Sequence, residues 1–156
     1  MLNRQVEMTP SEKASHTGKW AVTMAKVAIR RAVRKKFPRW ELVTFLGEHG
    51  SESRGVVDLL AIRKDHKAGR MGVKRGDYFE IILIQAKGGS AAMPTADDAR
   101  RLRAVARYCK ASAVLLSAWK KGESHEFHQL LEKTKKGASD WDKVPDLSAF
   151  FRRRSF

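Results

Sequence analysis

The sequence predicts an α/β protein in which helices flank a mixed β-sheet, in the order helix, three strands, helix, strand. Two segments carry apolar residues at helical spacing. Short runs rich in Val, Ile and Leu lie between and after them, and such runs are typical of buried strands. A glycine-containing loop joins the second and third strands, so we expect a hairpin there and a sheet of mixed direction.

The length and composition indicate one domain. With 156 residues, 42% of them hydrophobic, the chain can bury a substantial core around a sheet. Residues 1–16 are polar and lack periodicity, so we expect a flexible N-terminal arm, with Ser15 or Thr17 capping the first helix. Residues 17–156 then form a single domain, with a C-terminal extension from about residue 132.

The charge favours a polyanionic partner. The net charge is +15, from 32 Lys and Arg against 17 Asp and Glu, which attracts nucleic acid more readily than an anionic membrane surface. No apolar run approaches the roughly 20 residues of a membrane helix, and the N-terminus does not resemble a signal peptide. The single cysteine, Cys109, excludes an intramolecular disulfide, and no Cys and His group has zinc-ligand spacing. We therefore expect a cytoplasmic protein.

The first helix is predicted from Gly18 to Phe37, because Pro38 stops it. The stretch 19–39 holds eight basic residues and no acid. Three of these basic residues are spaced four apart on one face, namely Lys26, Arg30 and Arg34. This face is either an ordinary solvated helix surface or, since no acid compensates its charge, a phosphate-binding surface.

The second strand carries an unusual acid. A first strand is predicted over Glu41–Leu46, and a turn-rich stretch leads from it to the second strand at Val56–Ile62. That second strand is apolar apart from Asp58. A lone carboxylate in such a run indicates a functional site, and the alternative is a buried turn or ion-pair partner.

The third strand, Tyr78–Lys87, ends in two polar residues. The alternation of strand side chains places Gln85 and Lys87 on one face and Ala86 on the other. Glu80 lies an odd number of residues from Gln85 and therefore points to the opposite face. Antiparallel pairing with the second strand would bring Asp58 near Gln85.

The second half of the chain begins with another helix. Thr95 to Asp98 resembles a capping box and opens a helix that continues to about Lys110, with Cys109 interpreted as a core residue on its buried stripe. Ala113–Trp119 is the fourth strand, and Glu126–Leu131 is either a fifth strand or the start of a short helix. Apolar residues in the tail could pack back onto the domain: Trp141, Val144, Leu147, Phe150 and Phe151.

The polar residues of the two central strands suit phosphodiester hydrolysis. That reaction needs a positioned water, a divalent cation and a positive charge near the developing negative charge. Magnesium prefers oxygen ligands, so Asp58 is the first candidate ligand and the amide oxygen of Gln85 a weaker, neutral one. Lys87, on the same face, could hold the attacking water or the scissile phosphate.

These residues resemble the PD-(D/E)xK nuclease superfamily, which includes Holliday junction resolvases and Mrr-type restriction endonucleases. The resemblance covers roughly Gly18 to Trp119 and rests on Gly55-Val56-Val57-Asp58 and Ile84-Gln85-Ala86-Lys87 within this order of elements. It implies a restriction-endonuclease-like fold with an α-β-β-β-α-β core. It also implies that Asp58 occupies the position of the metal-binding aspartate, Gln85 that of the second acidic ligand and Lys87 that of the catalytic lysine.

The sequence departs from this family in two ways. Gln85 is neutral where most members have an acid, although Mrr-like enzymes also use glutamine, so we expect a lower metal affinity. Resolvase-like members place a glutamate on the first helix, and the predicted first helix has no acid. Glu48 or Glu52 could supply the missing ligand, with Glu48 preferred because it closes the strand that neighbours the strand of Asp58, and Glu12 is more distant.

The resemblance and the charge together predict a metal-dependent DNA endonuclease that uses Mg²⁺ or Mn²⁺. Its partner would be double-stranded or branched DNA rather than RNA, and a homodimer would supply the two sites that a double-strand break needs. Two alternatives stay open: a degenerate relative that binds DNA or RNA without cutting it, and a basic RNA-binding or ribosome-associated protein. The residues expected to grip the nucleic acid are Lys26, Arg30, Arg34, Arg54, Lys67, Arg70, Lys74, Arg75, Arg100, Arg103 and Arg107.

Overall fold

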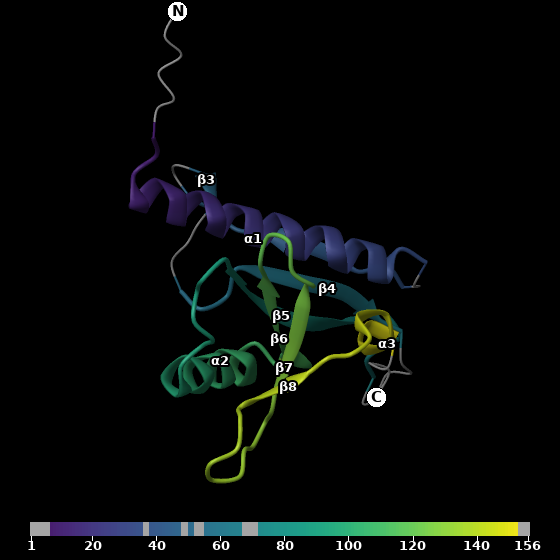
Figure 1. Ribbon diagram of the computed structural model, residues 1–156. Coiled ribbons are helices and arrows are strands. Elements are labelled where there is room, and N and C mark those ends of the chain that lie inside the picture. Colours follow the sequence, from purple (N-terminus) through teal and green to yellow (C-terminus); the bar gives the residue numbers. More distant parts are fainter. Residues whose placement is uncertain (1–6, 36–37, 48–49, 52–54, 67–71, 153–156) are drawn as a thin grey trace, which may run out of the picture.

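A mixed six-stranded sheet forms the centre of the protein (Figure 1). The computed structural model describes residues 7–35, 38–47, 50–51, 55–66 and 72–152. The strand order is β1-β4-β5-β6-β7-β8, and only β5 and β6 pair in parallel. The sheet strands are β1 (Glu41–Thr44), β4 (Leu59–Asp65), β5 (Tyr78–Gly88), β6 (Ala113–Trp119), β7 (Glu126–Leu130) and β8 (Trp141–Lys143). A separate pair consists of β2 (Leu46–Gly47) and β3 (Gly50–Ser51).

Helices cover both faces of this sheet. The helices are α1 (Pro10–Val33), α2 (Ala96–Tyr108) and α3 (Leu147–Arg152). The order α1, β1, β4, β5, α2, β6 is the predicted α-β-β-β-α-β core, and the β4–β5 hairpin is confirmed. The mixed α/β fold class is therefore correct.

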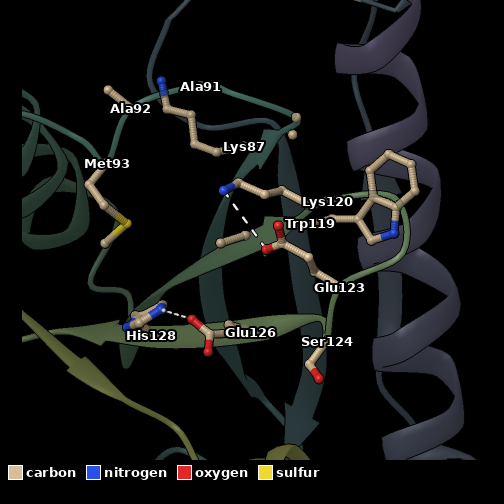
Figure 2. Close-up of a pocket in the computed structure, with 13 residues that line it drawn as sticks. Lys87, Ala91, Ala92, Met93, Trp119, Lys120, Glu123, Ser124, Glu126 and His128 are labelled. Atoms are coloured by element: carbon tan, nitrogen blue, oxygen red, sulfur yellow. Dashed lines mark ion pairs between the residues drawn. The ribbon is translucent and has the colours of Figure 1, made fainter.

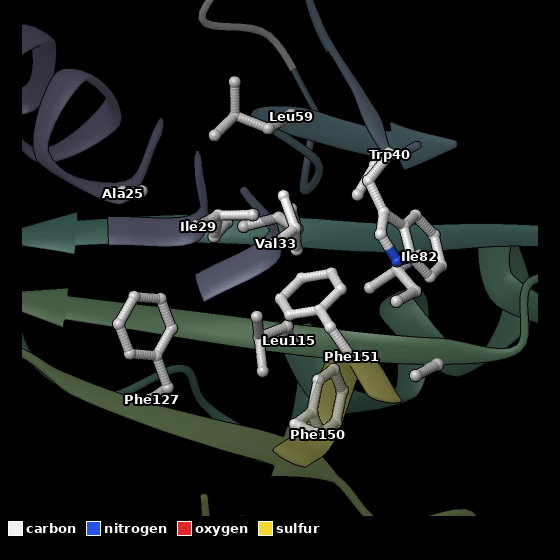
Figure 3. Close-up of a cluster of buried hydrophobic side chains, with 13 residues drawn as sticks. Ala25, Ile29, Val33, Trp40, Leu59, Ile82, Leu115, Phe127, Phe150 and Phe151 are labelled. Atoms are coloured by element: carbon white, nitrogen blue, oxygen red, sulfur yellow. The ribbon is translucent and has the colours of Figure 1, made fainter. Parts of the chain in front are cut away.

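Strand alternation divides the core into two clusters. On one face, α1 and α3 pack against residues such as Leu59, Ile82 and Ile84, and Figure 3 shows Phe150 and Phe151 of α3 in this cluster. On the other face, Ala99 and Leu102 of α2 pack with the intervening strand residues, including Leu83, Val114 and Leu116. Each strand residue can thus be assigned to the α1 face or the α2 face of the sheet.

Helix α1 begins eight residues before the predicted Gly18, at Pro10. Thr9 caps it, since the Thr9 side chain accepts a hydrogen bond from the Glu12 N–H while Glu12 Oε2 accepts one of 2.7 Å from the Thr9 N–H. The expectation of a flexible arm is therefore wrong for Pro10 to His16. The capping box and the proline in the first turn stabilise a helix start that polar composition had concealed.

Strand β4 is displaced relative to the prediction of Val56–Ile62. It begins at Leu59 and extends to Asp65, which pairs with Tyr78 of β5. Asp58 precedes the strand, yet its N–H donates a hydrogen bond of 2.9 Å to the Ile84 carbonyl, so backbone contact with β5 already exists there. Likewise, β1 ends at Thr44 rather than Leu46.

A buried ion pair lies on the α1 face of the sheet, near the start of β5. Arg63 Nη2 lies 2.7 Å from Glu80 Oε2, and both side chains are less than 10% exposed. The Arg63 guanidinium also lies 4.4 Å from the ring centroid of Trp40, which belongs to the α1-face cluster. The prediction that Glu80 points away from the face of Gln85 is therefore confirmed.

The C-terminal part completes the sheet and the core. Glu126–Leu130 is a strand, β7, which settles the alternative left open by the sequence. Trp141 packs in the α2-face cluster, and Phe150 and Phe151 pack in the α1-face cluster, as predicted for the tail. The interpretation of Cys109 as a core residue is wrong, because α2 ends at Tyr108 and Cys109 is exposed at its C-cap. None of the described helices is long and apolar enough to cross a membrane.

Candidate active site

Asp58 and the Gln85-Ala86-Lys87 segment meet inside the sheet, where β5 ends beside the residue that precedes β4. The side chain of Asp58 reaches across to β5, where its Oδ2 atom accepts a hydrogen bond of 2.7 Å from the N–H of Ala86. Ala86 packs against the α1-face cluster, whereas Leu83 belongs to the α2-face cluster. By alternation, Gln85 and Lys87 lie on the α2 face, as the sequence predicted.

Three influences act on the Asp58 carboxyl. Burial raises its pKa, while the hydrogen bond from Ala86 and the positive charge of Lys87 lower it in part. Desolvation is the largest of the three effects, so the pKa is raised overall. Such a shift is frequent in groups that act in binding or catalysis, and here it is accompanied by a specific cationic neighbour.

Gln85 is buried, and its amide oxygen is unsatisfied. Only 6% of the residue is exposed, and Oε1 has no hydrogen-bond partner among the described residues. Leaving a buried acceptor without a partner costs about 1–3 kcal/mol, so such an atom calls for a ligand. A carboxylate on Asp58 and an oxygen donor on Gln85 fit a hard divalent cation such as Mg²⁺.

The described residues do not complete a metal site by themselves. No group of three or more His, Cys, Asp or Glu side chains that could hold a metal occurs among them. Glu48 and Glu52, the predicted additional ligands, lie outside the described residues. Glu12, the more distant candidate, is engaged in the capping box of α1.

Lys87 has an acidic neighbour that sequence analysis missed. The positive charge of Lys87 lowers the pKa of Asp98 as well as that of Asp58, although the hydrogen bond from the Thr95 backbone is the main cause at Asp98. Asp98 occupies the first turn of α2 and forms its capping box with Thr95. The sequence showed the capping role only, because the proximity to Lys87 depends on how α2 packs on the sheet.

The end of β5 is held tightly against α1. A Cβ atom added at Gly88 would lie 2.8 Å from Cβ of Ala21 and 3.1 Å from the Thr17 carbonyl oxygen. Such distances require a shift of the helix, so only glycine fits at Gly88. The residue that follows Lys87 therefore fixes the separation between β5 and α1.

The predicted nucleic-acid contacts fall into three groups. Arg30, Arg34, Lys74, Arg75 and Arg107 are exposed, Lys26 is half-buried, and Arg100 is exposed in an ion pair with Asp97. Arg103 is instead structural, because it binds Asp140 at 2.7 Å and the Leu131 carbonyl at 2.8 Å, and its role as a phosphate contact is a wrong prediction. Arg54, Lys67 and Arg70 lie outside the described residues.

Comparison with known proteins gives one weak similarity. No protein-family model matches the chain, and no curated protein matches it. Among solved structures, the Holliday junction resolvase Hjc of Archaeoglobus fulgidus is similar, with 14% identity and a TM-score of 0.44. The alignment covers 85% of this chain and 93% of the resolvase chain.

Proposed function

We propose that this chain is a metal-dependent DNA endonuclease that hydrolyses phosphodiester bonds. The observation that carries the proposal is the hydrogen bond from the Ala86 N–H to Asp58, because it brings the carboxylate to the segment that bears Gln85 and Lys87. The buried Oε1 atom of Gln85, which has no hydrogen-bond partner among the described residues, adds an uncharged oxygen ligand on the α2 face of the sheet. The net charge of +15 suits a substrate whose backbone is a polyanion.

Each residue of the site would have a separate role in hydrolysis. Asp58 and Gln85 would hold Mg²⁺ or Mn²⁺, and Glu48 or Glu52 would complete the ligand set. The bound cation would supply a nucleophilic hydroxide and neutralise phosphate charge. Lys87 would donate a hydrogen bond to an oxygen of the scissile phosphate, where negative charge increases in the transition state.

The basic surface would hold the DNA backbone. The exposed cations of α1, of the turn before β5 and of α2 would contact phosphates, which gives affinity without sequence preference. The proposed contacts are Lys26, Arg30, Arg34, Arg54, Lys67, Arg70, Lys74, Arg75, Arg100 and Arg107. A homodimer would present two such sites to the two strands of a duplex or a branched junction.

A cleavage assay tests this function. The protein is incubated with supercoiled, linear and branched DNA in the presence of Mg²⁺, Mn²⁺ or a chelator. We expect cleavage with either metal, none with the chelator, and loss of cleavage in Asp58→Ala and Lys87→Ala. Lys135→Ala is the matched control for lost charge, because Lys135 is exposed in the segment between β7 and β8. Cleavage that survives both substitutions at the site would refute the proposed site.

A second candidate function is DNA or RNA binding without cleavage. It is favoured by the ligand set, because Asp58 brings one negative charge and Gln85 none, and the described part of the chain holds no group of three or more His, Cys, Asp or Glu side chains that could bind a metal. In this case no metal would promote cleavage, whereas binding would remain tight and would weaken steeply with salt. Lys87→Ala would then weaken binding no more than the control Lys135→Ala.

A further inference from the structure

A pocket adjoins Lys87 on the side of β5 away from Asp58. It has a volume of about 600 Å³ and lies at the ends of β5 and β6 and the start of β7 (Figure 2). This volume is within the range of about 300–1,000 Å³ that small-molecule sites occupy. Figure 2 shows Lys87 on one side of the pocket, Glu126 and His128 on the opposite side, and Met93 between them at its edge.

The sheet register explains why space remains here. Lys87 of β5 pairs with Ala118 of β6, and Ala118 pairs with Glu126 of β7, so a small side chain separates two long polar ones. Neighbouring strands are about 4.8 Å apart, so the Cα atoms of Lys87 and Glu126 are separated by roughly 10 Å. Ala118 thus forms a floor between a cationic wall and an acidic wall.

The charges that line the pocket differ from those of the chain as a whole. Its lining carries two lysines, Lys87 and Lys120, and two glutamates, Glu123 and Glu126. Lys120 Nζ lies 3.8 Å from Glu123 Oε2, so the charges of these two side chains largely neutralise each other. In a chain of net charge +15, a pocket with balanced charge is poorly suited to bind a phosphate and better suited to a neutral polar group.

The far wall offers hydrogen-bonding groups that are held in place. Glu126 Oε1 lies 2.5 Å from Lys143 Nζ, and Glu126 Oε2 lies 3.5 Å from His128 Nε2. Lys143 holds the pKa of Glu126 below its ordinary value, so the carboxylate stays an acceptor with lone pairs to spare. Met93, which is 49% exposed, adds an apolar, polarisable surface that suits an aromatic ring.

We propose that this pocket binds an unpaired nucleobase adjacent to the phosphate held by Lys87, so that DNA with an extrahelical nucleotide is the preferred substrate. This inference rests on the proposed nuclease function and deepens it. A base has an aromatic face for Met93 and an edge that can donate hydrogen bonds to Glu126. Bases in an intact duplex are stacked and paired, and withdrawing one costs a few kcal/mol, whereas a bulged base is already free.

Binding to three DNA duplexes tests this inference in the presence of a chelator, so that cleavage plays no part. One duplex is fully paired, one carries a single-nucleotide bulge, and one carries the same bulge without its base. We expect the intact bulge to bind about tenfold more tightly than the abasic bulge. This factor corresponds to the binding free energy that stacking of one base contributes in a protein site. The abasic bulge separates recognition of a base from recognition of a bent backbone.

Filling the pocket should remove this preference. Ala118→Leu places a larger side chain on the floor, and we expect the intact and abasic bulges to bind equally while the paired duplex binds as before. Ala104→Leu, the same substitution at an exposed position of α2, should leave the tenfold difference unchanged. Should Ala118→Leu fold poorly, His128→Ala removes part of the far wall and should likewise reduce the preference.

The outcomes separate the two proposals. Equal binding of the intact and abasic bulges by the unmodified protein would overturn the nucleobase pocket, even if the protein cleaves DNA with Mg²⁺. An equal loss of affinity for all three duplexes in Ala118→Leu would also overturn it. A tenfold preference without cleavage in any metal would support the pocket and refute the nuclease function.

Discussion

Asp58 and Ala86, 28 residues apart in the chain, are joined by a hydrogen bond of 2.7 Å from a backbone N–H to a carboxylate oxygen. The donor belongs to the residue between Gln85 and Lys87. The carboxylate is therefore positioned by the main chain of β5, which is buried in the middle of the sheet. A donor on the backbone cannot change rotamer, so the strand itself sets the position of the Asp58 carboxylate relative to the main chain of Gln85 and Lys87.

Two substitutions at Asp58 should separate its chemical and structural roles. Asp58→Asn keeps an oxygen acceptor for the Ala86 N–H but removes the charge, so we expect cleavage to fall by roughly 100-fold with no loss of stability. Asp58→Ala also leaves that N–H without its partner, which should lower the free energy of unfolding by about 1–3 kcal/mol. Urea unfolding and a cleavage assay measure the two effects. Full activity in Asp58→Asn would contradict a role for the charge.

The raised pKa of Asp58 predicts a pH dependence of stability. The folded state binds this proton more tightly than the unfolded state, so the stability contributed by the group is fully present below its ordinary pKa of 3.8. It is lost as the pH rises through the raised pKa of the folded state. Asp58→Asn should abolish this loss, so the variant gains stability relative to the unmodified protein between acidic and neutral pH.

Lys87 should modulate the same titration. Because its charge lowers the pKa of Asp58, Lys87→Gln should move the titration to a higher pH and enlarge the loss of stability. Thermal or urea unfolding across the acidic range measures the shift. Identical profiles for Lys87→Gln and the unmodified protein would show that the two charges do not interact.

Gly88, which contacts α1, and Gly18, which lies within α1, allow a matched comparison. Gly88→Ala should destabilise the fold by about 1–3 kcal/mol, since its Cβ would lie 2.8 Å from Cβ of Ala21 and force the helix to move. Gly18→Ala, with nothing within 4 Å of its added Cβ, should stabilise α1 by up to about 1 kcal/mol. Chemical unfolding of both variants compares them, and equal effects would contradict the close approach at Gly88.

The buried pair of Arg63 and Glu80 should behave as a unit. Glu80→Leu removes the carboxylate that lies 2.7 Å from the buried Arg63 guanidinium, and we expect the free energy of unfolding to fall by about 3–5 kcal/mol. The double variant Arg63→Met/Glu80→Leu should lose much less than the sum of the two single variants, because both buried charges are removed together. A double-mutant cycle by urea unfolding measures this coupling, and additive losses would show that the pair contributes nothing as a pair.

Arg103 and Arg107 lie one turn apart on α2 and should give opposite results. Arg103→Ala breaks the contacts to Asp140 and Leu131, so it should lower stability and leave the salt dependence of DNA binding unchanged. Arg107→Ala should leave stability unchanged and, if Arg107 contacts a phosphate, reduce the slope of log affinity against log salt by about 0.9. Titrations at several salt concentrations distinguish the two, and a reversed pattern would contradict these assignments.

Local patterns in the sequence predicted much of the architecture. The alternation along Tyr78–Lys87 placed Gln85 and Lys87 on one face, because a strand has a fixed period of two. The apolar run around Asp58 predicted a neighbouring strand, and the glycine-containing loop predicted the hairpin that brings the two strands together. These features depend on residues close in sequence, or on a single hairpin, and such features can be inferred without coordinates.

The errors have physical reasons of two kinds. The start of α1 differs from the prediction because its first residues are polar and carry no apolar stripe, although the capping box formed by Thr9 and Glu12 is present in the sequence. Arg103 and the pocket beside Lys87 depend instead on distant pairings, namely that of Arg103 with Asp140 and that of β5 with β6. Nothing near these residues in the sequence specifies those contacts.

The exposed position of Cys109 offers a direct route to the oligomeric state. It is the single cysteine of the chain and caps the end of α2, about 16 Å along the helix from Asp98 beside Lys87. A nitroxide spin label attached there would react at one place without any engineered residue. Two copies of the protein bound to one DNA molecule would then report the separation of their labels by pulsed electron resonance, whereas a lone copy would give no dipolar signal.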